Sequence, residues 1–449
     1  MHIPNNVQYV LEQLHLKGHE AYIVGGCVRD MILGIVPQDY DVTTSAEPEE
    51  VKAIFPRTID TGIEHGTVTV MIDKEGFEVT TYRIDGDYLD HRRPDTVLFT
   101  KSLEEDLKRR DFTINAMAYN EEEGIIDHFN GQEDLELGIL RCVGVAQERF
   151  TEDALRMLRA IRFAARFAFV IEASTAKAIG ELNHLIQNIS GERVRMELTK
   201  ILCSKHPEYI EYLVTYGLLE HVIPEFMPCV GLAQNHPYHV YDVDRHTYEC
   251  LKNVRAEEGL RWAVYLHDIG KGYAKTTDDH GIDHFHGHPT ISVAKADVIL
   301  KRLKFDNRTK KRVLLLIAYH DYRFAANLKS VRRAMAKIGK DLFMEYLDVQ
   351  VADIKGQNPD KEAVRMVEIG LKAQLYEEVL ALEQCVEIKD LTIGGEDLIA
   401  AGLPRGKVIG EVLNHLLDLV IESPDKNQAS VLLKEVEIYL RNRGQNEVE

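Results

Sequence analysis

The spacing of apolar residues changes part-way along this chain of 449 residues. Up to about residue 120, short apolar or alternating runs such as AYIVGG (21–26) and QDYDVTT (38–44) lie between helical segments. GTVTVMI and GFEVTTYR flank the turn DKEG, as the strands of a hairpin would. From about residue 133, apolar residues recur at the three- and four-residue intervals of amphipathic helices. The pattern therefore predicts an α/β head followed by a mostly α-helical body.

Glycine, proline and histidine positions divide the chain further. We predict an α/β head at 1–130, a helical neck at 131–235, a histidine-bearing helical body at 236–360 and a helical tail at 361–449. No internal repeat or low-complexity segment interrupts this order.

The composition is that of a globular protein, with 45% hydrophobic and 28% charged residues. No apolar run approaches the roughly 20 residues that cross a bilayer, and the first residues do not have the pattern of a secretory signal. The six cysteines are scattered without a CxxC pair, which favours reduced thiols. We therefore expect a cytoplasmic protein that has no membrane partner.

The formal net charge of −19 argues against non-specific binding of nucleic acid. Basic residues nevertheless gather locally, as in KSLEEDLKRR (101–110) and at four arginines within 156–166. Such clusters are compatible with a specific, salt-sensitive RNA groove.

Asp39 and Asp41 lie two residues apart in the predicted strand at 38–44, so alternation places both carboxylates on one face. Adjacent carboxylates repel each other unless a cation lies between them, and oxygen ligands of this kind suit Mg²⁺. Metal-assisted phosphoryl transfer needs this arrangement. The alternative is a solvated strand end, because Asp-x-Asp is a common tripeptide.

The surrounding residues make this motif more specific. Gly25-Gly26 lets the backbone approach a phosphate, and Arg29 follows one helical turn later. The run GGCVRDMILG…QDYDVTT, followed by RRDFTINAMAY (109–119) and TEDALRMLRAIRFAARF (151–167), resembles the class II tRNA nucleotidyltransferase and bacterial poly(A) polymerase family. That family lies within the DNA polymerase beta superfamily.

The resemblance implies a DNA polymerase beta-like nucleotidyltransferase head and a neck that binds nucleotide and RNA. It implies that Asp39 and Asp41 are catalytic and hold Mg²⁺. It also implies that Gly26, Arg29 and Arg110 contact the incoming nucleotide.

In the neck, Asp153, Arg156, Arg159 and Arg162 recur every three residues, which on a helix gives one slowly drifting stripe. A carboxylate and a guanidinium can together read the Watson–Crick edge of cytosine or adenine. In the resembling family the pair that matches Asp153 and Arg156 selects C and A, while Arg159 and Arg162 would meet phosphate or the RNA end. The alternative is a ladder of surface salt bridges.

The body carries a second constellation of possible metal ligands. WAVYLHDIGKG places His267-Asp268 at the end of an apolar helix, and imidazole with carboxylate suits several divalent metals. The pattern resembles the HD phosphohydrolase superfamily. The resemblance implies a second divalent metal, of unknown identity, with the following ligands: His246, His267, Asp268 and Asp353, with His288 and His320 as the further histidines of binuclear members.

The leading functional hypothesis is addition of CCA to the 3′ end of tRNA from CTP and ATP with Mg²⁺, with an additional HD phosphohydrolase activity. The charged segment 83–97 resembles the flexible loop that accompanies addition of the terminal A in this family. The family's poly(A) polymerases carry a basic stretch at the position of GIEHGTV (62–68), and its absence here favours tRNA over poly(A) as the product. Three alternatives remain open: an enzyme that adds only A, a poly(A) polymerase, and an HD phosphohydrolase with a non-catalytic head.

Overall fold

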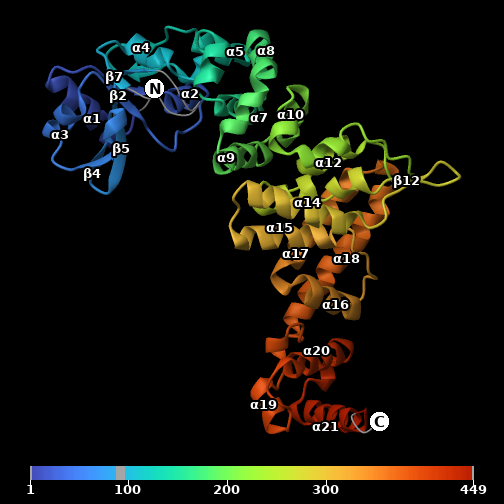
Figure 1. Cartoon of the computed structure of the whole chain (residues 1–449). Coiled ribbons are helices and arrows are strands. Elements are labelled where there is room, and N and C mark those ends of the chain that lie inside the picture. Colours follow the sequence, from blue (N-terminus) through green and yellow to red (C-terminus); the bar gives the residue numbers. More distant parts are fainter. Residues whose placement is uncertain (1–2, 87–96, 447–449) are drawn as a thin grey trace. The chain divides into compact units, whose positions relative to one another are not determined.

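The structure is a computed structural model that describes residues 3–86 and 97–446 (Figure 1). It forms two compact units. The first contains the chain up to Met227 together with Arg302–Lys304, and the second contains Pro228–Lys301 and the chain from Phe305 onward. Most of the predicted loop at 83–97 lies outside the described residues. Among the described residues, no helix has both the length and the apolar character needed to span a membrane.

A mixed sheet of seven strands forms the centre of the first unit. Its order is β3-β4-β5-β2-β1-β8-β9, in which only β2 and β5 run parallel. The strands are β1 (Ala21–Val24), β2 (Val42–Thr44), β3 (Thr58–Gly62), β4 (Thr67–Ile72), β5 (Glu75–Thr81), β8 (Ala118–Asn120) and β9 (Gly124–Ile126). The predicted hairpin is β4–β5, and Asp73 takes a positive φ of 54° in its turn.

The two faces of this sheet differ in polarity because side chains alternate along each strand. Val68, Val70 and Val79 are buried, and helices α1 (Asn5–Leu16) and α3 (Pro48–Ile54) contact the sheet. The residues between them, such as Glu78 on β5, are partly or fully exposed. The part of the sheet formed by β4 and β5 therefore has one packed face and one open, polar face, whereas β1 and β2 are buried throughout.

Helices complete the first unit. The α-helices are α2 (Gly26–Ile32), α4 (Leu103–Lys108), α5 (Gly131–Leu137), α6 (Ala146–Glu152), α7 (Leu155–Phe167), α8 (Ala173–Leu182), α9 (Gly191–Leu202), α10 (Tyr212–Thr215) and α11 (Leu219–Val222). Two small ribbons pair β6 (Arg83–Asp85) with β7 (Val97–Phe99) and β10 (Ile139–Leu140) with β11 (Val170–Ile171). Helix α7 buries its apolar residues and packs against α9, while its arginines stay partly or fully exposed.

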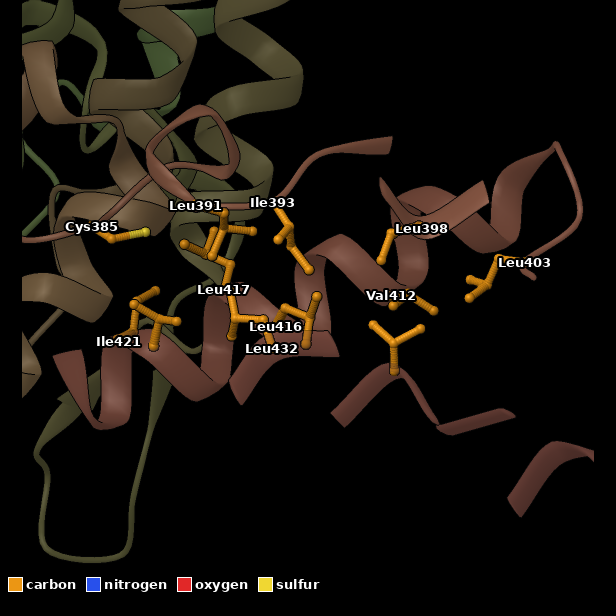
Figure 2. Packing of buried hydrophobic residues seen from close by; sticks show 12 residues of the cluster. Cys385, Leu391, Ile393, Leu398, Leu403, Val412, Leu416, Leu417, Ile421 and Leu432 are labelled. Carbon is orange, nitrogen blue, oxygen red and sulfur yellow. The ribbon is translucent and has the colours of Figure 1, made fainter. Parts of the chain in front are cut away.

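The second unit is almost entirely helical. Its helices are α12 (Val243–Lys252), α13 (Glu258–Leu266), α14 (His288–Arg302), α15 (Asn307–Tyr319), α16 (Leu328–Ile338), α17 (Phe343–Lys355), α18 (Glu362–Ala381), α19 (Gly395–Ala400), α20 (Lys407–Glu422) and α21 (Ala429–Asn446). A hairpin of β12 (Thr276–Thr277) and β13 (Asp283–His284) interrupts them. Figure 2 shows the small apolar core of the tail, where Leu416 of α20 lies near Leu432 of α21.

These elements confirm the predicted α/β head and helical body, with two local corrections. Strand β2 begins only at Val42, so Asp39 and Asp41 precede it rather than lying within it. Asp153 lies in the break between α6 and α7, not on the helix of the three arginines. The break arises because Asp153 takes an extended conformation, with φ −136° and ψ 103°.

Candidate functional site

Asp39 and Asp41 lie on the approach to β2, both exposed, at the wall of one pocket. Asp41 continues the pairing of β2, because its carbonyl accepts a hydrogen bond of 3.0 Å from the Val24 amide. Desolvation raises the pKa of Asp41, the guanidinium of Arg110 opposes that shift, and the negative charge of Asp39 adds to it. Two interacting carboxylates of this kind are suited to share a divalent cation.

Glu78 brings a third carboxylate to the same pocket. Val42 of β2 pairs with Val79 of β5, so one residue earlier Asp41 and Glu78 are the next pair in register. Both side chains belong to the open face, opposite the buried Val42 and Val79. The sequence analysis missed Glu78, because only the pairing of two distant strands brings it to Asp41.

The glycine turn makes room for Arg110. Gly25 takes a φ of +78°, and a Cβ there would lie 2.9 Å from Arg110 Nη1. Arg110 Nη2 lies 3.7 Å from Asp106 Oδ2, and its buried Nε has no hydrogen-bond partner among the described residues. Gly26 follows Gly25 as the first residue of α2, and a Cβ there would meet the Arg29 guanidinium at 3.6 Å. The structure thus brings the Gly25-Gly26 turn, Arg110 and Asp41 together, and their contacts with nucleotide and metal stay a prediction.

Arg29 is placed differently from its neighbours. It is 3% exposed, and its guanidinium donates to Asp30 at 2.6 and 2.8 Å and to the side chain of Asn115. It also lies over the rings of Phe163 and Phe167. Contact with a triphosphate would therefore require these bonds to exchange, and the predicted role of Arg29 stays a prediction.

The neck residues Asp153 and Arg156 are linked through the backbone, where the Arg156 amide donates to the Asp153 carbonyl at 3.0 Å, and their side chains have other partners. Asp153 accepts from Arg193 on α9 at 2.7 Å and from the amide of Leu155 at 3.0 Å. Arg156 pairs with Glu152 and donates to the backbone carbonyl of Arg109 at 3.0 Å. The turn before α7 thus holds the Asp153 carboxylate against α9, and the predicted contact of Asp153 and Arg156 with a base edge stays a prediction.

The remaining arginines of α7 each face a carboxylate. Arg159 bonds to Asp111 at 2.6 and 2.7 Å, and Arg162 bonds to Glu197 at 3.2 Å. Burial alone would raise the pKa of Asp111, but Arg159 and the Asn115 amide outweigh it and hold that pKa at about 2. The Arg159 pair connects the neck to the head, the Arg162 pair joins α7 to α9, and both orient the arginine stripe.

In the second unit, four histidines converge with matched orientations. The Nδ1–H of each ring donates to a backbone carbonyl, those of Gly356, Val264, Phe285 and Ile317 for His246, His267, His288 and His320 respectively. A carbonyl can only accept, so each Nδ1 carries the proton and each Nε2 presents a lone pair. This is the arrangement that metal-binding imidazoles need.

The Nε2 atoms form two groups around Asp268. His246 and His267 lie 3.3 and 3.2 Å from Asp268 Oδ2, while His288 and His320 lie 3.2 and 3.5 Å from Oδ1. Asp353 Oδ1 joins the first group at 3.3 Å from His246. All six predicted ligands are buried and gathered here, and Asp268 can bridge two cations.

Two positively charged side chains, those of Lys271 and Arg323, lie beside this centre. A pocket of about 300 Å³ is lined by Asp268, His288, Lys271 and Arg323, among others. Lys271 Nζ lies 2.7 Å from Asp268 Oδ2, and Arg323 Nη2 lies 3.3 Å from Asp353 Oδ2. Such a pocket can accept an anion such as a phosphate group. The sequence analysis missed Arg323, which approaches only through the packing of its loop on α17.

Known proteins resemble this chain in sequence over nearly its whole length. The chain is 51% identical to the CCA-adding enzyme of Ligilactobacillus salivarius over 448 residues, 97% of this chain and 96% of that one. The chain belongs to the family of CCA-adding enzymes. A second CCA-adding enzyme, from Limosilactobacillus reuteri, is 36% identical over 95% of both chains.

Three family models divide the CCA-adding sequence along its length. "Poly A polymerase head domain" matches residues 21–141, "Probable RNA and SrmB- binding site of polymerase A" matches 168–229, and "tRNA nucleotidyltransferase domain 2 putative" matches 285–436. Among solved structures, the CCA-adding enzyme of Bacillus stearothermophilus in complex with CTP has a TM-score of 0.76 at 29% identity. That match covers 99% of this chain and 100% of the other.

Proposed function

We propose that this chain adds the nucleotides C, C and A to the 3′ end of tRNA without a nucleic-acid template, using CTP and ATP. The observation that carries the proposal is the carboxylate pair Asp39 and Asp41 on the open sheet face beside Arg110, in a chain so similar to CCA-adding enzymes. RNA and tRNA are the partners that the matching family models name.

Asp39, Asp41 and Glu78 are the groups proposed to hold divalent cations, with Mg²⁺ as the expected ion. When bound, such an ion lowers the pKa of the attacking 3′-hydroxyl and offsets the charge of the triphosphate. Arg110, already beside Asp41, would contact triphosphate oxygens, and Gly26 would let them approach the backbone. The open face leaves space for the primer end.

Base selection is assigned to Asp153 and Arg156. The carboxylate accepts from the exocyclic amine of C or A, and the guanidinium donates to the ring. Arg193 pairs with the side chain of Asp153, and Glu152 pairs with that of Arg156. These ion pairs position the two side chains at the start of α7 before a nucleotide arrives. Arg159 and Arg162 would then face the nucleotide or the RNA end.

Primer extension tests this proposal. Three tRNA transcripts, ending before CCA, after C and after CC, are each mixed with one triphosphate and Mg²⁺. We expect CTP to extend the first two and ATP the third, and Asp41→Asn to abolish all three reactions with an unchanged melting temperature. Extension of the CC-ended transcript alone would indicate an A-adding enzyme, and a long A tail would indicate a poly(A) polymerase.

We propose a second activity, metal-dependent hydrolysis of phosphate esters, for the second unit. The convergence of four Nε2 atoms on Asp268 beside Lys271 and Arg323 supports it. The test is hydrolysis of phosphomonoesters and cyclic phosphodiesters by protein loaded with Mn²⁺, Ni²⁺ or Zn²⁺. Wild-type rates that persist in His267→Ala would overturn the assignment, whereas Asp41→Asn should leave these rates unchanged.

We also propose the four domains bounded near residues 130, 235 and 360, and a cytoplasmic location. Limited proteolysis with mass spectrometry should cut first near those positions. Cleavage that instead begins inside α7 or α13 would contradict the boundaries.

A further inference from the structure

A chain of hydrogen-bonded side chains connects the head to helix α7 of the neck, and Asn115 lies in the middle of it. Asn115 is 6% exposed. Its Nδ2 donates to Asp111 Oδ1 at 3.0 Å, and its Oδ1 accepts from Arg29 Nη1. The other oxygen of Asp111 accepts from Arg159 of α7 at 2.7 Å. One amide therefore joins a guanidinium of α2 to the ion pair that holds α7.

The two ends of this amide face groups of opposite charge. The Arg29 guanidinium can only donate, so it faces the oxygen of Asn115. Although burial raises the pKa of Asp111, Arg159 and the Asn115 amide hold it at about 2, so this carboxylate is ionised and can only accept. An amide carries an acceptor and a donor on one planar group, which alanine lacks and aspartate supplies only in part. The side chain of Asn115 is thus matched to both of its neighbours.

The two arginines of this chain also lie over a common ring, that of Phe163 on α7. Arg29 Cζ is 5.2 Å and Arg159 Cζ is 5.5 Å from the centroid of the ring. Phe163 is buried, so the ring and the hydrogen-bonded chain form one packed contact between α2 and α7. Helix α2 begins at the glycine turn of the proposed triphosphate site, and α7 carries Arg156 of the proposed base-selecting pair in its first turn. The orientation of each helix is thereby tied to that of the other.

We propose that Asn115 is a positioning residue for nucleotide addition: it aligns Arg29 of the triphosphate site with the pair of Asp111 and Arg159, so that triphosphate binding and base selection depend on one buried contact. The inference rests on the nucleotidyl transfer proposed above. Asn115 acts through Arg29 and Arg159, not on the reacting atoms. Without its amide, the Arg29 guanidinium and the Asp111 carboxylate each lose a hydrogen bond and are free to shift. Both the affinity for CTP and the preference for CTP over UTP should then fall.

The test is single-turnover extension of a full-length tRNA transcript ending before CCA, over a range of CTP or UTP concentrations. In Asn115→Ala, the half-saturating CTP concentration should rise at least about tenfold, and the CTP-to-UTP preference should fall at least about threefold. Thr113→Val is the matched control. Thr113 lies in the same short turn, is 2% exposed, and bonds to the carboxylate of Asp134 at 2.6 Å, outside the chain. Lost stability alone lowers the amplitude of a single turnover, so this control should melt earlier and leave both readouts unchanged.

A second variant, Asn115→Asp, provides the test where Asn115→Ala fails to fold. It keeps the shape and the acceptor for Arg29, but it replaces the donor to Asp111 with a second carboxylate that repels it. The CTP-to-UTP preference should fall in this variant too. An unchanged preference in either folded variant, an unchanged half-saturating CTP concentration in Asn115→Ala, or equal changes in Thr113→Val would overturn the role of Asn115 and leave the proposed function standing. Wild-type protein that extends no transcript would overturn the nucleotidyl transfer itself.

Discussion

Asp153→Asn is the sharpest test of how this enzyme chooses bases without a template. In the wild type, Asp153 accepts two hydrogen bonds from the Arg193 guanidinium and one from the Leu155 amide. Asparagine keeps the shape and one oxygen acceptor, but it replaces the other oxygen with a donor. The variant therefore removes the negative charge and one of the two oxygens proposed to accept from the exocyclic amine of C and A.

The magnitude follows from the type of contact. A well-placed pair of hydrogen bonds to a base edge contributes about 1–3 kcal/mol of discrimination, or roughly 5–150-fold in relative kcat/KM. The ion pair with Arg193 is lost as well, and the two side chains are 16% and 24% exposed. Because a partly solvated pair stabilises weakly, we expect unfolding free energy to fall by only about 1 kcal/mol.

The assay is single-turnover extension of a transcript ending before CCA, with CTP and UTP measured separately. The ratio of the two kcat/KM values should fall by at least about fivefold in Asp153→Asn. Arg193→Gln is the control, because it breaks the same ion pair and keeps the carboxylate of Asp153. An unchanged ratio in Asp153→Asn would refute the templating role, and an equal fall in Arg193→Gln would assign the effect to the ion pair.

Three further predictions concern stability. The pKa of Asp111 is depressed to about 2 in the folded chain, so its contribution of about 2 kcal/mol is present above pH 4 and is lost as pH falls toward 2. The thermal stabilities of wild type and Asp111→Asn, followed by circular dichroism, should therefore converge at low pH. Glu257→Ala removes the side chain that caps the N-terminus of α13 and that accepts two hydrogen bonds from the Arg312 guanidinium. The substitution should lower the free energy of unfolding by about 2 kcal/mol. Urea unfolding followed by fluorescence of Trp262, the one tryptophan of the chain, measures this change. A decrease below about 0.5 kcal/mol, roughly the error of the method, would contradict the prediction. Gly356→Ala would force a methyl against Cys250. It should cost about 1–3 kcal/mol by the same probe, and an unchanged free energy of unfolding would count against the packing argument.

Local sequence determined a large part of this protein. Apolar periodicity predicted the hairpin β4–β5 and the change from α/β head to helical body, because burial of one face depends mainly on residue spacing. The Gly-Gly turn and the pair Asp39 and Asp41 were recognisable because they act within a few consecutive residues. The resemblance of three motifs indicated the family that full-length comparison then showed.

Only the tertiary structure decided which distant groups meet. Glu78 reaches Asp41 through the register of two parallel strands, and Arg193 reaches Asp153 through the packing of α9 on α7. Asn115 was one polar residue of a local motif until the packing of α2 placed it between the Arg29 guanidinium and the Asp111 carboxylate. Side-chain spacing along a chain is set by local backbone geometry, whereas contacts between separate elements depend on how their apolar faces pack, and the sequence of a single element does not contain that information.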